Sequence, residues 1–167
     1  LMNSFYGVLG TPGCRFYDPK LASSITRRGH EILLKTRDLI EEKGYATIYG
    51  DTDSVFVHMT AESTSVMEAA ADLASYLDEW WRNELATRYG ISSFLELEFE
   101  THFTQFFMPT IRGSEKGSKK RYAGLVDDGA GGRQLVFKGL ESVRSDWTPL
   151  AKEFQQQLYF KVFHGEP

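Results

Sequence analysis

The sequence predicts an α+β domain in which an antiparallel β-sheet carries helices on one face. Two segments repeat apolar residues at helical spacing, and residues 94–101 alternate strictly between apolar and acidic side chains. The expected order is helix, strand, acidic turn, strand, helix, strand. This order is the tail of a split β-α-β-β-α-β fold that lacks its first strand. We therefore expect an excised fragment, with sequence lost upstream of Leu1.

The first two helices are predicted from their end signals. Residues 1–10 have the pattern of a helix end followed by glycine turns. Asp18 and Pro19 predict the start of a second helix, because aspartate suits the N-cap and proline the first turn. Gly44 predicts its end. Its apolar stripe is Leu21, Ile25, Gly29, Ile32, Thr36 and Leu39, with Leu33 and Ile40 beside it. Because glycine disfavours a helix, we expect Gly29 to pack closely against the sheet.

A β-hairpin with two acids at its tip follows the second helix. Residues 45–49 and 54–59 are rich in aromatic and β-branched side chains, and Gly50 with Asp51 is a turn signal. In an extended chain, side chains two apart point the same way, so Asp51 and Asp53 are expected to face one point. Two adjacent carboxylates favour Mg²⁺ or Mn²⁺. The alternative is an ordinary solvated turn, in which aspartate is common.

A third helix and a half-buried strand are expected next. Residues 65–68 form a capping-box pattern, and the helix runs to Tyr89. Trp80 and Trp81 are expected in the core. The alternating segment 94–101 predicts a strand whose exposed face carries Glu96, Glu98 and Glu100.

The last third of the chain predicts a further strand, a second hairpin and a helix. Residues 103–111 are apolar and aromatic, and residues 119–126 and 133–138 flank a glycine-rich tip. Thr148 and Pro149 predict the start of the final helix. Its apolar residues are Leu150, Phe154, Leu158 and Val162.

Composition excludes several classes of protein. No run of ~18 apolar residues exists that would cross a membrane. The single cysteine, Cys14, excludes an internal disulfide framework and a cysteine-based zinc site, so we expect a cytoplasmic protein. The net charge of −4 argues weakly against nucleic acid as a partner. Five cations nevertheless cluster within ten positions, which suits a nucleic acid held along one face. They are Arg112, Lys116, Lys119, Lys120 and Arg121.

Four motifs, in order along the chain, resemble those of family B DNA polymerases. Residues 3–7 resemble the fingers-helix motif and residues 49–54 the catalytic palm hairpin. Residues 119–124 resemble the primer-contacting strand, and residues 138–146 resemble the palm-to-thumb junction. The segments between the first two motifs, at 11–19 and 23–32, look like a bacterial branch of the family.

The resemblance implies a polymerase palm, with the end of the fingers before it and the start of a helical thumb after it. Residues 1–15 are then the end of the fingers helix and its connection, residues 16–143 the palm, and residues 144–167 the start of the thumb. It also implies a DNA-directed DNA polymerase, a transferase of DNA replication or repair. Such an enzyme joins a nucleotide to a primer 3′-hydroxyl and releases pyrophosphate with the help of two Mg²⁺ or Mn²⁺ ions.

The resemblance also assigns roles to single residues. Asp53 is implied as the principal metal ligand, Asp51 as a second carboxylate and Glu100 as a supporting acid; for Glu100 the alternative is a solvated strand face. Asn3, Tyr6 and Gly7 would line the nascent base pair. The residues implied to contact DNA are Thr52, Lys119, Lys120, Arg121, Tyr122, Lys138, Gly139 and Arg144. The implied partners are primer–template DNA, a deoxynucleoside triphosphate and a sliding clamp bound by the parent protein.

Departures from the family pattern weigh against activity of this chain alone. The family's first catalytic aspartate precedes the fingers, and its triphosphate-binding lysine lies four residues before Asn3, so neither position falls within the chain. We therefore expect the 167 residues not to polymerise by themselves. Two alternatives remain: a non-catalytic DNA-binding or structural module of the same fold, which the presence of both Asp51 and Asp53 disfavours, and an RNA-synthesising palm enzyme. The motifs at residues 3–7 and 119–122 disfavour the latter.

Overall fold

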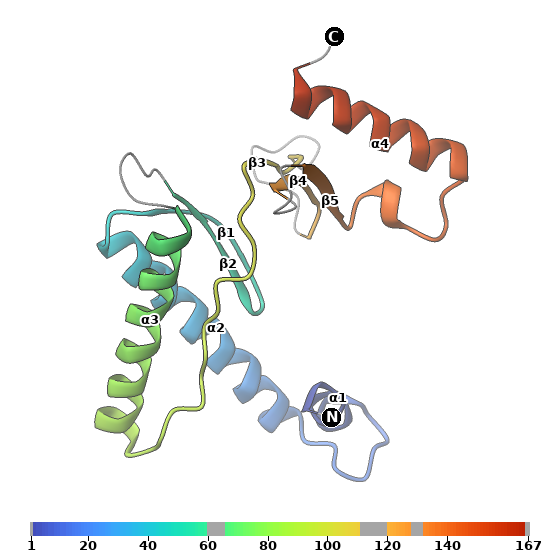
Figure 1. The fold of residues 1–167 in the computed structure, drawn as a ribbon. Helices are drawn as coiled ribbons and strands as arrows, with labels where there is room; N and C mark the ends of the chain where they lie inside the picture. The colour runs from blue at the N-terminus through green and yellow to red at the C-terminus, as the bar shows by residue number, and fades with distance from the viewer. Residues whose placement is uncertain (1, 60–65, 111–119, 128–131, 166–167) are drawn as a thin grey trace. The chain divides into compact units, whose positions relative to one another are not determined.

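The computed structural model describes residues 2–59, 66–110, 120–127 and 132–165, and the chain divides into two compact units (Figure 1). The first unit is Leu1–Glu98 and the second is Phe99–Pro167. Both combine helices with a small antiparallel sheet, so the α+β class is confirmed. No helix of the described residues is long and apolar enough to cross a membrane.

The first unit contains helices α1 (Met2–Gly10), α2 (Pro19–Glu42) and α3 (Val66–Tyr89), and strands β1 (Ala46–Asp51) and β2 (Ser54–His58). The predicted start of α2 is confirmed, since Oδ1 of Asp18 accepts hydrogen bonds from the backbone N of Lys20 at 2.9 Å and of Leu21 at 3.3 Å. These bonds satisfy amides that a helix start leaves unpaired. The predicted end is confirmed too, with Gly44 at φ +87°.

Packing of α2 against the hairpin occurs further along the helix than the sequence predicted. A Cβ built on Gly29 would have no other heavy atom within 4 Å, so the expectation of close packing there is wrong. The close approach occurs at Gly50 of β1, where a Cβ would lie 3.5 Å from both δ-methyl groups of Leu33. Leu33 is four residues beyond Gly29, which is about one helical turn.

The core of the first unit lies between α2, α3 and the hairpin (Figure 1). Its buried residues are Leu39, Ile40, Leu73 and Leu77, with Val55, Val57 and Trp80 packed against them. Trp81 is buried as expected, and its indole Nε1 donates a hydrogen bond to Oγ1 of Thr36 at 2.9 Å. The start of α2 is less covered: Leu21 and Ile25 are both about half exposed.

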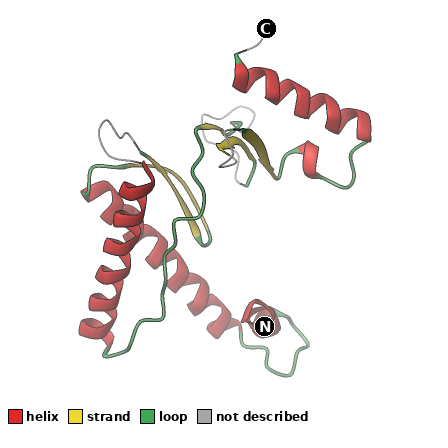
Figure 2. Cartoon of the chain, viewed as in Figure 1, coloured by secondary structure: helices red, strands yellow, loops and turns green. Residues whose placement is uncertain are grey.

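The alternating segment at residues 94–101 is extended but is not a strand, which corrects the prediction (Figure 2). Its burial does alternate, with Leu95 and Leu97 half-buried and the glutamates exposed. No strand of the described residues pairs with it, and a strand requires a ladder partner. A side chain supplies one of the missing bonds: Oδ1 of Asp78 in α3 accepts from the backbone N of Leu97 at 2.8 Å.

The second unit contains a three-stranded antiparallel sheet in the order β3 (Gln105–Phe107), β4 (Tyr122–Asp127), β5 (Arg133–Lys138). The predicted second hairpin is confirmed, with Tyr122 opposite Lys138 and Asp127 opposite Arg133. The strand expected at residues 103–111 is shorter than predicted. Gly124 allows the ring of Phe103 to cover β4, because a Cβ there would lie 2.1 Å from Cδ1 of that ring.

The short 3₁₀ helix η1 (Glu141–Val143) and helix α4 (Pro149–His164) complete the second unit. The predicted N-cap is confirmed, since Thr148 accepts from the backbone N of Ala151 at 3.3 Å. The core is formed by Ala123, Leu140 and Phe163, with Tyr159 and Phe137 packed against it. The apolar residues named from the sequence of this helix are exposed, at 48% to 77%: Leu150, Phe154, Leu158 and Val162.

Candidate functional site

The acidic end of the first hairpin is built by a two-residue turn. Asp51 is the last residue of β1 and pairs with Ser54, so the turn is Thr52–Asp53, not Gly50–Asp51 as the sequence suggested. Thr52 has φ +52°, and the N–H of Asp53 donates to the carbonyl of Asp51 at 2.5 Å. The two acids are therefore not placed on one side of a single extended strand, as the sequence predicted. They are brought to one end of the hairpin by the turn itself.

The two carboxylates differ in their surroundings. Asp51 is half-buried, and its Oδ1 accepts from the Thr52 hydroxyl at 3.1 Å. Asp53 is exposed, and its Oδ1 accepts from the Ser54 hydroxyl at 3.2 Å. Each neighbouring hydroxyl therefore orients one acid. Behind them, Gly50 lets β1 approach α2 closely, so the acids stand on a hairpin supported by a helix.

The donor set at this hairpin suits a hard cation. Mg²⁺ is commonly bound by one or two carboxylates, with water and substrate phosphates completing its octahedron, so Asp51 and Asp53 fit that ion. They form an incomplete protein cage, since no group of three or more His, Cys, Asp or Glu side chains suited to a metal occurs among the described residues.

Glu100, the third acid implied by the resemblance, is exposed and belongs to the second unit. Its role as a supporting acid stays a prediction.

The motif near the N-terminus lies on α1. The hydroxyl of Tyr6 is hydrogen-bonded to Oγ1 of Thr26 in α2 at 2.8 Å, and the side chain is 43% exposed. A Cβ on Gly7 would meet no other heavy atom within 4 Å. Gly7 therefore lies open on the helix surface, as a close approach by a ligand would require. The Asn3 side chain lies outside the described part of the chain.

In the predicted primer-contacting segment, the backbone just before β4 has an unusual conformation. Lys120 has φ +63° and is exposed, and Gly139 has φ +61°. A Cβ on Gly139 would lie 2.0 Å from the carbonyl oxygen of Lys120, so only glycine fits there. Lys120 lies two residues before β4, and Lys138 ends β5 opposite Tyr122, the first residue of β4, so both lysines lie near the same end of the sheet. Lys119, Arg112 and Lys116 lie outside the described residues.

The guanidinium of Arg121 takes part in an ion pair within the second unit. Its Nη2 forms an ion pair with Oε1 of Glu141 in η1. Gln155 of α4 donates from Nε2 to Oε2 of the same carboxylate at 2.9 Å. The hydrogen bond from Gln155, the larger cause, and the ion pair with Arg121 lower the pKa of Glu141. Sequence reasoning did not single out Glu141 or Gln155, although an acid just after a basic strand was the available signal.

Arg144 also has an acidic partner. Its Nε and Nη2 donate to the two carboxylate oxygens of Asp146 at 2.9 and 2.6 Å. This bidentate bond lowers the pKa of Asp146 and raises that of Arg144. Both side chains are more than half exposed, so the pair leaves the guanidinium accessible to a phosphate.

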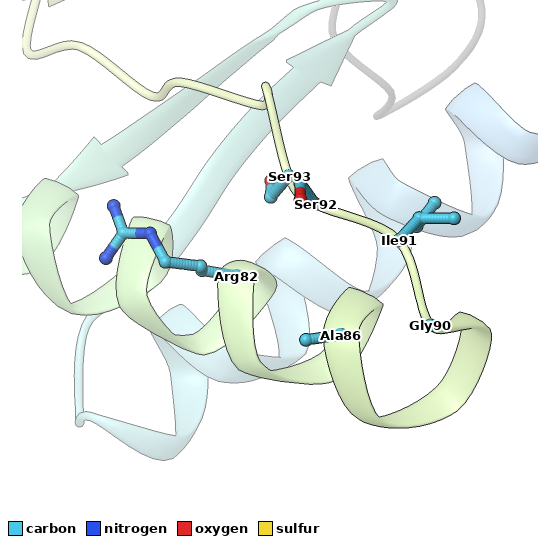
Figure 3. Close-up of a pocket in the computed structure, with 6 residues that line it drawn as sticks. All are labelled: Arg82, Ala86, Gly90, Ile91, Ser92 and Ser93. Carbon is cyan, nitrogen blue, oxygen red and sulfur yellow. The ribbon is translucent and has the colours of Figure 1, made fainter.

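A shallow hollow of about 390 Å³ lies elsewhere in the first unit, where α3 ends (Figure 3). It is lined by Arg82, Ala86, Gly90, Ile91, Ser92 and Ser93. None of these is an acid or one of the predicted site residues, so we assign this hollow no part in the site.

The chain belongs to DNA polymerase family B, because the model of that family matches residues 1–166. It is 55% identical over 172 residues to DNA polymerase II of Escherichia coli strain K12, which covers 100% of this chain and 21% of that protein. It is 30% identical to the DNA polymerase alpha catalytic subunit of Xenopus laevis, over 99% of this chain and 10% of that protein.

A solved structure agrees with this family. The family B DNA polymerase of Pyrobaculum calidifontis matches 93% of this chain with a TM-score of 0.57 and 30% identity, and the match covers 16% of that polymerase. The recognition made from the four motifs is confirmed, and the identity to the Escherichia coli polymerase II over the whole chain agrees with the bacterial branch that it named. The chain spans about a fifth or less of the length of these relatives.

Proposed function

We propose that this chain is the palm-containing part of a DNA-templated DNA polymerase, and that Asp51 and Asp53 are its catalytic carboxylates. The observation that carries the proposal is a two-residue turn that presents both acids at the end of a supported hairpin, in a chain of family B. In the parent protein the primer 3′-oxygen attacks the α-phosphorus of a deoxynucleoside triphosphate. The bond from that phosphorus to the bridging oxygen breaks, pyrophosphate leaves, and the hydroxyl proton passes to water.

The chain's own residues bind and orient the reactants. Asp53, being exposed, is the principal ligand for Mg²⁺ or Mn²⁺, and Asp51 is the second. When bound, two such ions would lower the pKa of the primer hydroxyl and neutralise charge on the leaving phosphates. We further infer that Glu100 acts as a supporting acid and that Thr52 contacts DNA.

Other residues of the chain bind the duplex and the nucleotide. Lys120, just before β4, and Lys138, at the end of β5, are exposed and bind phosphates of the primer–template duplex. Tyr122 and Arg144 contact the duplex as well, as does Lys119, which lies outside the described residues. Gly139 supports the same surface by letting the two strands approach. Tyr6 and Gly7, with Asn3, line the edge of the nascent base pair. We infer the palm over residues 16–143, the fingers end before it and the thumb start after it, and a sliding clamp as a further partner of the parent.

A non-catalytic DNA-binding module of the same fold is the competing function. Such a module would need the basic strand but not the acids, and both acids are present with oriented carboxylates. The parent sequence discriminates between the two: an aspartate on a strand before the fingers motif supports the enzyme, and its absence supports the module.

Primer extension tests the proposal. With Mg²⁺, a primer–template and four deoxynucleoside triphosphates, the parent protein is expected to extend the primer according to the template. The 167-residue chain alone is expected to extend nothing, because it holds only part of the metal ligands. No synthesis by the parent would refute the enzyme, and template-dependent synthesis by the isolated chain would refute its predicted inactivity.

A further inference from the structure

Three segments of the second unit meet at one carboxylate. Arg121 immediately precedes β4, Glu141 begins η1, and Gln155 lies in the second turn of α4. The two oxygens of Glu141 are used by different partners, Oε1 by Arg121 and Oε2 by Gln155. Gln155 also accepts through Oε1 from the backbone N of Ser142 at 2.6 Å. We call Arg121, Glu141 and Gln155 the clamp.

The clamp is partly withdrawn from solvent. The side chain of Glu141 is 18% exposed and that of Arg121 is 41% exposed. Nε of Arg121 is buried and has no hydrogen-bond acceptor among the described residues. The guanidinium is therefore held in place by its ion pair with Glu141. A partly buried, hydrogen-bonded ion pair has a defined geometry that an exposed pair lacks.

The clamp fixes the backbone that presents Lys120. Lys120 is adjacent to Arg121 and has a left-handed backbone conformation at φ +63°. Its carbonyl lies against Gly139, two residues before Glu141. A left-handed lysine is strained and persists only when its surroundings hold it. The Arg121 side chain and the Gly139 backbone, which lie close to each other, provide that hold.

The clamp also affects the net charge at this end of the sheet. Glu141 neutralises Arg121, whereas Lys120 and Lys138 are both exposed at this end of the sheet. An arginine that contacted phosphate would release counterions on binding, whereas an arginine neutralised by an internal acid would not.

We propose that Glu141 and Gln155 are positioning residues that commit Arg121 to an internal clamp, and that this clamp orients the Lys120 strand for duplex DNA. The inference rests on the proposed function and changes one part of it, because Arg121, assigned to DNA contact from the sequence, then acts through Lys120. It also ties α4 to the duplex-binding strand, so a displacement of α4 is transmitted to Lys120.

Salt dependence of duplex binding separates the two roles of Arg121. The affinity of the 167-residue chain for a primer–template duplex is measured by fluorescence anisotropy across a series of NaCl concentrations. Lys120→Ala is expected to lower the slope of log K against log salt by about 0.9, the value of one phosphate contact. Arg121→Gln is expected to weaken binding at every salt concentration while leaving the slope unchanged. A slope reduced by Arg121→Gln as much as by Lys120→Ala would overturn the proposal.

Two glutamines of α4 test the positioning role: Gln155 is the residue tested and Gln157 is the matched control. Gln155→Ala is expected to weaken duplex binding about three- to tenfold, within the range of couplings between contacting residues. In the Arg121→Gln background the same change is expected to have no further effect, since both act through one clamp. Gln157 is exposed on the same helix and donates to Glu153 at 3.2 Å, so Gln157→Ala is the control expected to leave binding unchanged. Additive effects of Arg121→Gln and Gln155→Ala would contradict the clamp.

A urea-unfolding cycle tests the clamp without DNA. Arg121→Gln and Gln155→Ala are expected to be non-additive in the unfolding equilibrium constant, whereas Arg133→Gln, at the exposed Arg133–Asp127 pair with 3.6 Å between its atoms, is expected to add independently. If the wild-type chain shows no salt-dependent binding to duplex, the DNA-binding proposal for this chain fails and the positioning proposal fails with it. If binding is present but the cycle is additive, the clamp alone is refuted.

Discussion

Gly139 lies directly against Lys120, so that a Cβ on the glycine would be 2.0 Å from the lysine carbonyl oxygen. Both residues have positive φ, +61° for Gly139 and +63° for Lys120. The junction between the last strand and η1 therefore closes over the start of β4 through backbone contact. This contact joins the turn that carries the exposed Lys120 to the end of β5, where Lys138 is also exposed.

Gly139→Ala is expected to destabilise the chain by more than the ordinary cost of a left-handed alanine. That cost is about 1 kcal/mol, and displacement of the Lys120 carbonyl adds to it. Gly165→Ala is the matched control, because Gly165 has φ +68° but no heavy atom within 4 Å of a built Cβ. Urea unfolding of both variants measures the difference. Equal losses would show that the strand start moves aside without cost.

Trp81→Phe is expected to destabilise the first unit by about 1–2 kcal/mol through the lost hydrogen bond to Thr36. Thr36 is 2% exposed, so water does not replace the indole donor. Trp80→Phe is the control, since Trp80 packs against the core cluster and edge-to-face on Trp81, with the ammonium of Lys35 over its ring. Urea midpoints of the two variants should differ by about 1 kcal/mol in free energy of unfolding. A larger loss for Trp80→Phe would contradict this account of the core.

Much of the helical structure was predictable from short-range chemistry. Asp18 with Pro19 and Thr148 with Pro149 both cap helices as expected, because capping depends on residues adjacent in sequence. The Gly29 prediction failed since the position of a helix–sheet contact depends on tertiary packing, and the contact falls one turn away, at Leu33. Segment 94–101 alternates in burial as predicted but forms no β-ladder. Alternation in the sequence indicates which side chains share a face, whereas strand pairing also needs a partner strand.

The candidate site was likewise predictable only where it depends on residues adjacent in sequence. The hairpin carrying Asp51 and Asp53 was predictable from composition, but its turn was misplaced by two residues, because glycine was taken to mark a turn when it marks the approach of Leu33. The clamp was not predicted: Arg121 and Glu141 are twenty residues apart, and Gln155 lies fourteen further on. A run of basic residues in a sequence does not reveal which of them has an internal acid as its partner.

The ion pair of Glu141 predicts a loss of stability in acid. Its hydrogen bond from Gln155 and its pairing with Arg121 lower its pKa in the folded chain. The stabilisation is therefore complete above the unfolded pKa of about 4.3 and is lost as the pH falls through the lower folded pKa. Urea midpoints of wild type and Glu141→Gln should converge below about pH 4. Glu153→Gln, at an exposed acid of α4, should follow wild type throughout; a constant gap for Glu141→Gln would be the contrary result.

Tyr159 predicts a loss of stability at the alkaline end. Burial first, and then the negative charge of Glu141, raises the pKa of its phenol. The folded chain holds this proton more tightly, so the stabilisation is complete below the unfolded pKa of about 10 and is lost as the pH rises through the folded value. Glu141→Gln should lower the pKa of Tyr159, as followed by NMR of chains with ¹³C-labelled tyrosine. An unchanged titration would show that Glu141 exerts no field on the ring.

The role of Asp53 is tested most directly by single-turnover nucleotide incorporation in the parent polymerase. Asp53→Asn is expected to reduce the incorporation rate by roughly 10²–10³-fold or more while leaving the dissociation constant for primer–template nearly unchanged, because the loss is in charge stabilisation during reaction. Asp127→Asn, at an exposed acid at the opposite end of the β4–β5 hairpin from Lys138, is the control expected to incorporate like wild type. Equal incorporation rates for Asp53→Asn and wild type would contradict the assignment of the acidic hairpin as the catalytic site.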